Sequence, residues 1–162
     1  MNVYLLRHSQ AEAGYPDGQR QLTVRGRSHA QLLGEFLRRS PDDLPGRVLC
    51  SSLVRARETL ELVGAAWSGE PLSEPEVLES LVPEGNPLEV VSVLESMQED
   101  VLLVGHNPSM EALSSLLMSG ERCRARLVVK TCVLLCFNWS PFPNHGETGP
   151  AALRWMLDPR SL

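Results

Sequence analysis

The sequence predicts an α/β fold, a three-layer α/β/α sandwich with a mostly parallel central sheet. Short apolar runs alternate along the chain with longer stretches in which apolar residues recur every three or four positions. Each helix between two such strands carries the chain back over a face of the sheet, which makes the strands parallel. With 162 residues, of which 43% are hydrophobic, we expect one domain over residues 1–162.

The first strand and helix are expected at the start of the chain. Residues 2–6 form a short apolar run that gives way abruptly to polar residues from Arg7, as a buried strand does when it enters a loop. After this loop, Thr23 is an expected N-cap, and apolar residues follow it at helical spacing. The pattern stops at residues 40–41, where the first helix should end.

A second strand and helix follow directly. Residues 47–50 predict a buried strand, and Ser51 and Ser52 are candidate caps for the helix after it. Apolar residues at steps of three and four mark that helix: Leu53, Ala56, Leu60 and Val63. Residues 67–86 contain several Pro and Gly and no sustained period, so an irregular excursion on the surface is expected there.

The next unit begins with a helix. Asn86 and Pro87 supply an N-cap followed by proline at the first helical position, and the apolar period continues towards Glu99. Residues 101–104 are continuously apolar, which predicts a buried strand.

The last part of the chain completes the fold. Asn107 and Pro108 repeat the same cap chemistry ahead of another apolar helical pattern. Residues 127–139 and 151–157 predict two closing strands, separated by the turn-rich residues 140–150.

Composition excludes several classes of function. The net charge of -5 gives no general attraction to nucleic acid or to anionic membranes, so neither is an expected partner. The longest apolar stretch, residues 132–137, is far shorter than the ~18 to 20 residues that a membrane span needs. The first residues do not form a secretory signal. We therefore expect a cytoplasmic protein that binds any anion locally, and for which a monomer is plausible.

The four cysteines are expected to be free thiols. A core of this size does not need disulfides, and the cytoplasm would reduce them. A zinc site of Cys132, Cys136 and His145 is conceivable, but the chain has no C-x-x-C pair, and both cysteines stand in an apolar run. We favour a core role for them and expect neither a metal nor a cofactor.

Basic residues gather where the predicted strands end. Arg7 and His8 follow the first strand, Arg55 follows the second, and His106 follows the strand of residues 101–104. Because parallel strands end at one edge of a sheet, these side chains should meet there. Arginine forks match phosphate, and a neutral imidazole can attack phosphorus to give a covalent phosphoenzyme. Cationic side chains can neutralise the phosphoryl oxygens without a metal.

Four segments, in their order and spacing over residues 3 to about 118, resemble one known family: Leu6-Arg7-His8, Leu22-Thr23-Val24-Arg25-Gly26, residues 51–59, and Val104-Gly105-His106-Asn107. The family is the histidine phosphatase superfamily, with the phosphoglycerate mutase-like fold. The short chain is most similar to the small SixA-type phosphohistidine phosphatases. This resemblance implies that His8 is the nucleophile that becomes phosphorylated, and that Arg7, Arg55 and His106 form the phosphate pocket. It also places Arg20 near the pocket mouth.

The sequence departs from the family pattern in two places. Ser9 stands where the family has glycine after Arg-His, which bears on how His8 is placed. Larger relatives take a general acid from the middle excursion, and here Glu79, Glu84 or neither residue could serve. A phosphohistidine leaving group needs less acid help than an alkoxide, so the lack of a clear donor favours phosphoramidate substrates.

The leading hypothesis is therefore a metal-independent phosphatase that removes phosphate from phosphohistidine on a signalling or phosphotransfer protein. A small-molecule phosphomonoester phosphatase with the same mechanism is the nearest alternative. A third possibility is a phosphoprotein-binding regulatory module in which Ser9 misplaces His8 and turnover is lost.

Overall fold

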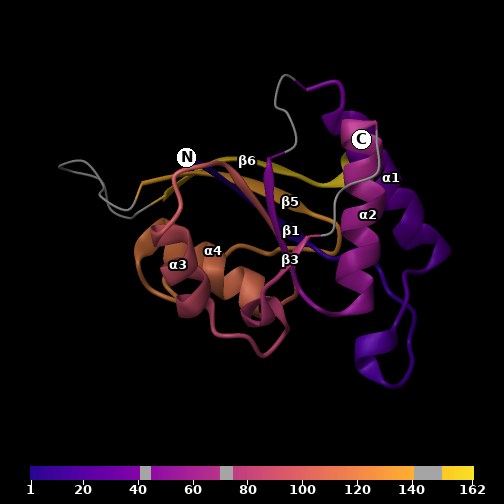
Figure 1. Ribbon diagram of the computed structural model, residues 1–162, viewed down its shortest axis with the longest axis horizontal. Helices are drawn as coiled ribbons and strands as arrows, with labels where there is room; N and C mark the ends of the chain where they lie inside the picture. The colour runs from indigo at the N-terminus through magenta and orange to yellow at the C-terminus, as the bar shows by residue number, and fades with distance from the viewer. Residues whose placement is uncertain (41–44, 70–74, 141–150) are drawn as a thin grey trace.

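A mostly parallel sheet forms the centre of the protein (Figure 1). The computed structural model describes residues 1–40, 45–69, 75–140 and 151–162, and in these ranges the sheet has six strands in the order β3-β2-β4-β1-β5-β6. Strands β1 to β4 run parallel, whereas β5 and β6 are each antiparallel to their neighbours. The strands are β1 (Asn2–Arg7), β2 (Arg47–Cys50), β3 (Glu76–Val77), β4 (Val101–Gly105), β5 (Leu134–Trp139) and β6 (Ala151–Leu157).

Helices cover both faces of this sheet. Helices α1 (Val24–Leu37) and α2 (Val54–Ser68) lie on one face, and α3 (Pro87–Glu95) and α4 (Ser109–Ser119) lie on the other (Figure 1). Three short 3-10 turns complete the described elements: η1 (Asp17–Gln19), η2 (Glu79–Leu81) and η3 (Pro159–Ser161). This arrangement confirms the α/β/α sandwich predicted from the sequence.

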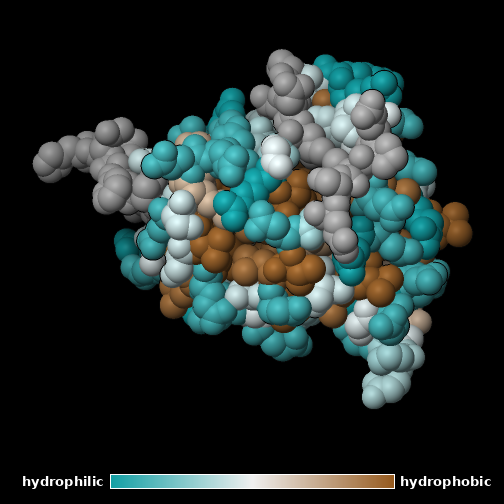
Figure 2. Space-filling view, viewed as in Figure 1, coloured by the Kyte–Doolittle hydropathy of each residue, from teal (hydrophilic) through white to brown (hydrophobic). Residues whose placement is uncertain are grey.

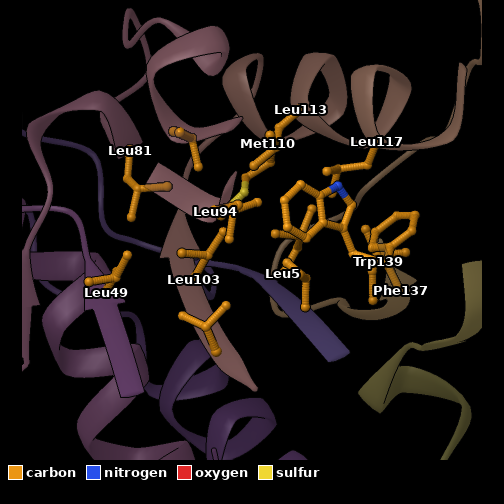
Figure 3. Packing of buried hydrophobic residues seen from close by; sticks show 14 of the residues in the cluster. Leu5, Leu49, Leu81, Leu94, Leu103, Met110, Leu113, Leu117, Phe137 and Trp139 are labelled. Carbon is orange, nitrogen blue, oxygen red and sulfur yellow. The ribbon is translucent and has the colours of Figure 1, made fainter. Parts of the chain in front are cut away.

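Side chains of β1 alternate between two hydrophobic cores, as the period of a strand requires. Val3 and Leu5 join the core under α3 and α4, whereas Tyr4 and Leu6 join the core under α1 and α2. Figure 3 shows the first of these cores, with Leu5 among side chains of α3, α4 and β5. The central strands are thus buried on both faces, so the residues that follow their ends have a fixed position.

Helix α1 packs closely on α2 at Gly34. A Cβ added to Gly34 would lie 2.4 Å from the Val63 carbonyl oxygen and 2.6 Å from the Ala66 Cβ. We expect Gly34→Ala to lower the free energy of unfolding by about 1–3 kcal/mol, because the two helices must separate. Urea unfolding measures this, with Gly46→Ala as the control, since no atom lies within 4 Å of its added Cβ. Equal urea midpoints for the Gly34 variant and the wild type would show that the helices do not pack this way.

Two of the predicted helix starts are confirmed, and one predicted end is wrong. Thr23 and Asn86 each accept a backbone N–H of the following helix through the side chain, as N-caps do. Helix α3 ends at Glu95 instead of continuing towards Glu99.

Helix α2 is longer than predicted, and its start is built differently. Leu53 is the N-cap, with no side-chain capping bond, so neither Ser51 nor Ser52 caps the helix. Trp67, which we assigned to the surface excursion, lies in the last turn of α2 and is 4% exposed. Its ring meets that of Tyr4 edge-on at 6.1 Å, so packing against β1 keeps this turn helical.

Two further expectations are corrected in the second half of the chain. Asn107 does not cap α4: Pro108 is the N-cap, and the Asn107 Oδ1 accepts no hydrogen bond from the described residues, while its Nδ2 donates to Glu111 Oε1 and to the Val129 carbonyl oxygen. The strand predicted for residues 127–139 begins only at Leu134. Just before it, Cys132 has a φ of 62°, which is incompatible with an extended strand.

The face of the molecule drawn in Figure 2 carries mainly hydrophilic residues, with hydrophobic residues visible between them. Among the residues that the structure describes, no helix combines the length and the apolar character that crossing a membrane requires.

Candidate active site

Two neighbouring parallel strands bring a pair of histidines to one edge of the sheet. Arg7 at the end of β1 is in register with Gly105 at the end of β4, so His8 and His106 leave the sheet together. The His8 backbone N–H donates to the Gly105 carbonyl oxygen at 2.9 Å. The centroids of the two imidazole rings are 4.7 Å apart, so the histidines predicted to share a site are in contact.

The hydrogen bond of His8 defines its tautomer. His8 Nδ1 lies 2.6 Å from the Ser9 carbonyl oxygen, which can only accept, so Nδ1 carries the proton and Nε2 carries the lone pair. Burial lowers the pKa of His8 to about 4, and the charges of Arg55 and Arg7 act in the same direction. His8 is therefore neutral near pH 7, with Nε2 able to act as a nucleophile.

His106 is 1% exposed and is held by a serine from the end of β2. Its Nε2 lies 2.9 Å from Ser51 Oγ, which also accepts the Leu53 backbone N–H at 3.3 Å. A hydroxyl has one donor hydrogen and two acceptor lone pairs, so Ser51 Oγ can pair with Nε2 while the other ring nitrogen, Nδ1, is left for another partner. That nitrogen has no partner among the described residues. Burial, followed by the nearby His8 and Arg55, lowers the pKa of His106 to about 3, so this ring is also neutral.

Arg7 is held by the segment that precedes β5. Its NH1 donates to the Val129 carbonyl oxygen at 2.7 Å, while its Nε is buried and has no partner within the described ranges. The Cys132 backbone N–H donates to the carbonyl oxygens of Arg7 and His8, at 3.0 and 3.1 Å. This segment therefore fixes both the backbone and the guanidinium at the end of β1.

Arg55 reaches the same edge from the first turn of α2. It is 3% exposed, and it donates from NH1 to the Asp17 carbonyl oxygen at 2.8 Å and from NH2 to Asp17 Oδ2 at 2.9 Å. Arg20, whose side chain is 28% exposed, donates to the other carboxylate oxygen of Asp17 at 2.8 Å. Arg20 is thus joined to Arg55 through the shared Asp17 carboxylate, and the structure brings the five predicted site residues to one edge of the sheet.

Ser9 is accommodated without strain. It is fully buried, its hydroxyl donates to the Gly26 carbonyl oxygen at 2.7 Å, and its backbone N–H donates to Thr59 Oγ1 at 2.9 Å. Among the described non-glycine residues only Cys132 has a positive φ, so the backbone at Ser9 does not require glycine. The serine links the His8 loop to the first turn of α1. Gly26 is the position without room, because a Cβ there would lie 2.1 Å from the Gln10 carbonyl oxygen.

The two candidate general acids differ in their surroundings. Glu79 Oε2 accepts the Ser52 hydroxyl at 2.9 Å, which places this carboxylate beside the start of α2. Glu84 lies in a turn before α3. In the described part of the chain, neither carboxylate is hydrogen-bonded to His8 or His106.

The four cysteines are free thiols, as predicted. Cys132 and Cys136 are buried, and burial raises the pKa of the Cys132 thiol to about 11, which suits a core residue. His145, the third ligand of the conceivable zinc site, lies outside the described residues.

Sequence reasoning gave no role to several residues that hold the site. Val129 contributes only a carbonyl oxygen, so no side-chain pattern could identify it. Asp17 stands in a loop without any period. Thr59 did carry a signal, because it lies four residues after Arg55 on α2, and its hydroxyl donates to the Arg55 carbonyl oxygen.

Two neutral histidines lie beside arginine side chains at the edge of a parallel sheet. Such a site can bind an oxyanion and transfer a phosphoryl group, which is typical of α/β phosphoryl-transfer proteins. The chain belongs to the histidine phosphatase superfamily (branch 1), whose family model matches residues 3–82. The family resemblance seen in the sequence is confirmed, and the phosphohistidine phosphatase relatives together with the family match show that the chain is a phosphatase.

Named relatives agree with this membership. The chain is 34% identical to the phosphohistidine phosphatase SixA homolog of Haemophilus influenzae, over 67% of this chain and 71% of the relative. It is 32% identical to the phosphohistidine phosphatase SixA of Escherichia coli, over 100% of this chain and 96% of the relative. A solved structure of the protein histidine phosphatase SixA complexed with tungstate superposes with a TM-score of 0.85 at 27% identity, covering 99% of both chains.

Proposed function

We propose that the protein is a metal-independent phosphohistidine phosphatase in which His8 carries the phosphoryl group, and that residues 1–162 act as a single domain. The observation that supports this most directly is the state of His8, whose Nδ1 is committed to the Ser9 carbonyl oxygen while Nε2 keeps its lone pair. The pKa lowered by burial keeps that lone pair free at physiological pH.

The proposed reaction has two steps. His8 Nε2 attacks phosphorus, a P–N bond to His8 forms, and the P–N bond of the substrate phosphohistidine breaks. The substrate imidazole takes a proton from solvent on its second ring nitrogen and leaves as the neutral ring, while His8 keeps its Nδ1 proton. Water then attacks the phosphoryl group on His8, loses a proton, and releases inorganic phosphate with a neutral His8. Arg7, Arg55 and His106 donate to the phosphoryl oxygens in both steps, which stabilises the charge that develops there. Arg20 binds the substrate at the mouth of the site.

The substrate proposed is phosphohistidine on a signalling or phosphotransfer protein. The similarity to the two SixA relatives supports it, and so does the absence of a carboxylate hydrogen-bonded to the histidines of the described site. An imidazole leaving group needs little general-acid help. The four free thiols are compatible with the cytoplasm, where such a partner would be met.

The test compares a panel of phosphohistidine proteins with sugar phosphates, both with EDTA present. We expect turnover of the phosphohistidine proteins and retained activity in EDTA. Faster turnover of sugar phosphates would assign the protein to the phosphomonoester phosphatases. Loss of all activity in EDTA, restored by a divalent ion, would contradict the histidine-nucleophile mechanism. Binding of phosphoproteins without any turnover would identify a regulatory module.

The pH dependence follows from the lowered pKa values. A free histidine titrates near pH 6.5, but His8 and His106 are neutral down to about pH 4 and 3, so the nucleophile stays unprotonated well below pH 6.5. We expect the acid limb of kcat/KM to lie near pH 4, on a substrate whose own ionisation is constant in that range. Because the His8 and His106 rings are in contact, the apparent pKa of this acid limb belongs to the two histidines together and not to His8 alone. A limb centred at pH 6.5 would show that His8 is solvated as in a free imidazole.

A further inference from the structure

We infer that Asp17 is a positioning residue of the phosphate pocket: its carboxylate holds Arg55 and Arg20 together and turns the Nε edge of Arg55 towards the bound phosphate. This inference rests on the proposed function, because it assumes that Arg55 binds the phosphoryl group. Asp17 itself does not touch the reacting atoms and acts through the two arginines.

Asp17 accepts hydrogen bonds through its carboxylate and through its backbone carbonyl oxygen. Oδ2 and the backbone carbonyl oxygen accept from NH2 and NH1 of Arg55, at 2.9 and 2.8 Å. Oδ1 accepts from NH1 of Arg20 at 2.8 Å. One residue thus joins an arginine whose side chain is 4% exposed to a second whose side chain is 28% exposed.

The donors of Arg55 divide into two groups. A guanidinium has five N–H donors in a rigid plane, and Asp17 accepts one from NH1 and one from NH2. The Nε–H is buried and has no partner among the described residues. An arginine can present its Nε edge as a fork to phosphate while its far end stays bound to a carboxylate. Asp17 and phosphate can therefore occupy Arg55 at the same time.

The loop that carries Asp17 is itself anchored. Ala11 and Leu22 form an antiparallel bridge, and the Glu12 backbone N–H donates to the Gln21 carbonyl oxygen at 2.8 Å. Arg20 Nε donates to the Glu12 carbonyl oxygen at 2.6 Å. The loop is thus fixed at its base, which holds the segment carrying Asp17 beside the two arginines, although the Asp17 side chain itself is 58% exposed.

The charge of Asp17 also matters for the site. Arg55 and Arg20 carry like charges that a shared carboxylate screens at hydrogen-bond distance. Without it, the two guanidiniums would repel each other, and Arg55 would lose its charge-assisted acceptor and keep only the neutral Asp17 backbone carbonyl oxygen. The Nε edge would then no longer be held in one orientation.

A competing interpretation makes the opposite prediction. If the carboxylate instead occupied the place of phosphate on Arg55, phosphate would have to displace it, and removing Asp17 would strengthen oxyanion binding. The positioning role requires that removing Asp17 weakens it. The sign of the change in the inhibition constant therefore separates the two roles.

The experiment measures the inhibition constant of inorganic phosphate, kcat/KM and the thermal midpoint for Asp17→Ala, Asp17→Asn and Glu12→Gln. For Asp17→Ala we expect phosphate inhibition and kcat/KM each to weaken about tenfold or more, which is the scale of losing charge-assisted hydrogen bonds. Asp17→Asn keeps an acceptor oxygen and should recover part of the loss. Glu12→Gln removes an exposed carboxylate from the same loop and should stay within about twofold of the wild type.

A double-mutant cycle completes the test. In the Arg55→Ala background, Asp17→Ala should cost much less than it does alone, because its main target is gone. Tighter phosphate inhibition by Asp17→Ala, an equal loss in Glu12→Gln, or full additivity with Arg55→Ala would each overturn the inference. If Arg55→Ala alone leaves phosphate inhibition unchanged, the proposed phosphate pocket fails instead, so the two failures are distinguishable.

Discussion

His8→Ala should abolish turnover while the protein stays folded. Removing a nucleophile that forms a covalent intermediate costs at least about a thousandfold in kcat, because the remaining donors cannot replace the P–N bond to the enzyme. The fold should persist because His8 follows the end of β1, and the cores on both sides of that strand are left intact. The measurement is kcat on a phosphohistidine protein, with the thermal midpoint of the variant beside it.

Trapping the intermediate makes this prediction specific to His8. Brief reaction with a radiolabelled phosphohistidine protein, followed by denaturation, should leave label on the enzyme that is stable in alkali and lost in acid. The same treatment of His8→Ala should leave none. His29→Ala, which removes a half-buried histidine of α1 outside the site, should react and label like the wild type. More than a few per cent of residual turnover in His8→Ala, or label that remains on it, would reject His8 as the nucleophile.

The part of the site that could be predicted from the sequence is the part set by strand ends. Apolar runs identify β1, β2 and β4, and parallel strands end at one edge, so His8, Arg55 and His106 could be brought together without coordinates. In the structure, Arg7 pairs with Gly105, and the ring centroids of His8 and His106 are 4.7 Å apart.

The contacts that hold these side chains could not be predicted, because they depend on the paths of loops. Arg55 meets Asp17 across 38 residues of sequence, and Arg7 meets the Val129 carbonyl oxygen across 122 residues. Asp17 stands in a loop without any period, and Val129 contributes only its backbone carbonyl oxygen, which no side-chain pattern reveals. Their positions follow from tertiary packing, which a single sequence does not encode in any local spacing.

The strand predicted for residues 127–139 is wrong only in its first part, residues 127–133, and for a related reason. Val129 and Val133 are buried, as their apolar side chains predict. They belong to an irregular segment that crosses the end of β1, so their burial comes from packing in the core and not from a strand. Cys132 interrupts this segment with a φ of 62° and directs its N–H to Arg7 and His8. An apolar run indicates burial, and only the hydrogen bonds decide whether the buried chain is a strand.

Arg55→Ala is expected to have the second largest effect on catalysis. Removing one preorganised donor to a developing oxyanion costs about 100- to 1,000-fold in rate, and Arg55 supplies a full charge as well as a fork. Its charge interacts with the ground state and the transition state alike, so inhibition by phosphate, vanadate and tungstate should weaken together with kcat/KM. Arg55→Lys keeps the charge without the planar fork and should recover only part of either quantity.

The control for Arg55 lies on the same helix. Arg57 is exposed and lies two residues further along α2, so its side chain leaves the helix in another direction. Arg57→Ala should therefore keep kcat/KM and oxyanion inhibition within about twofold of the wild type. Oxyanion inhibition that is unchanged in Arg55→Ala, or that falls equally in both variants, would mean that the first turn of α2 does not bind phosphate. If oxyanion inhibition weakens in Arg55→Ala and not in Arg57→Ala, the anion binds at Arg55, whose NH1 and NH2 groups are held by Asp17.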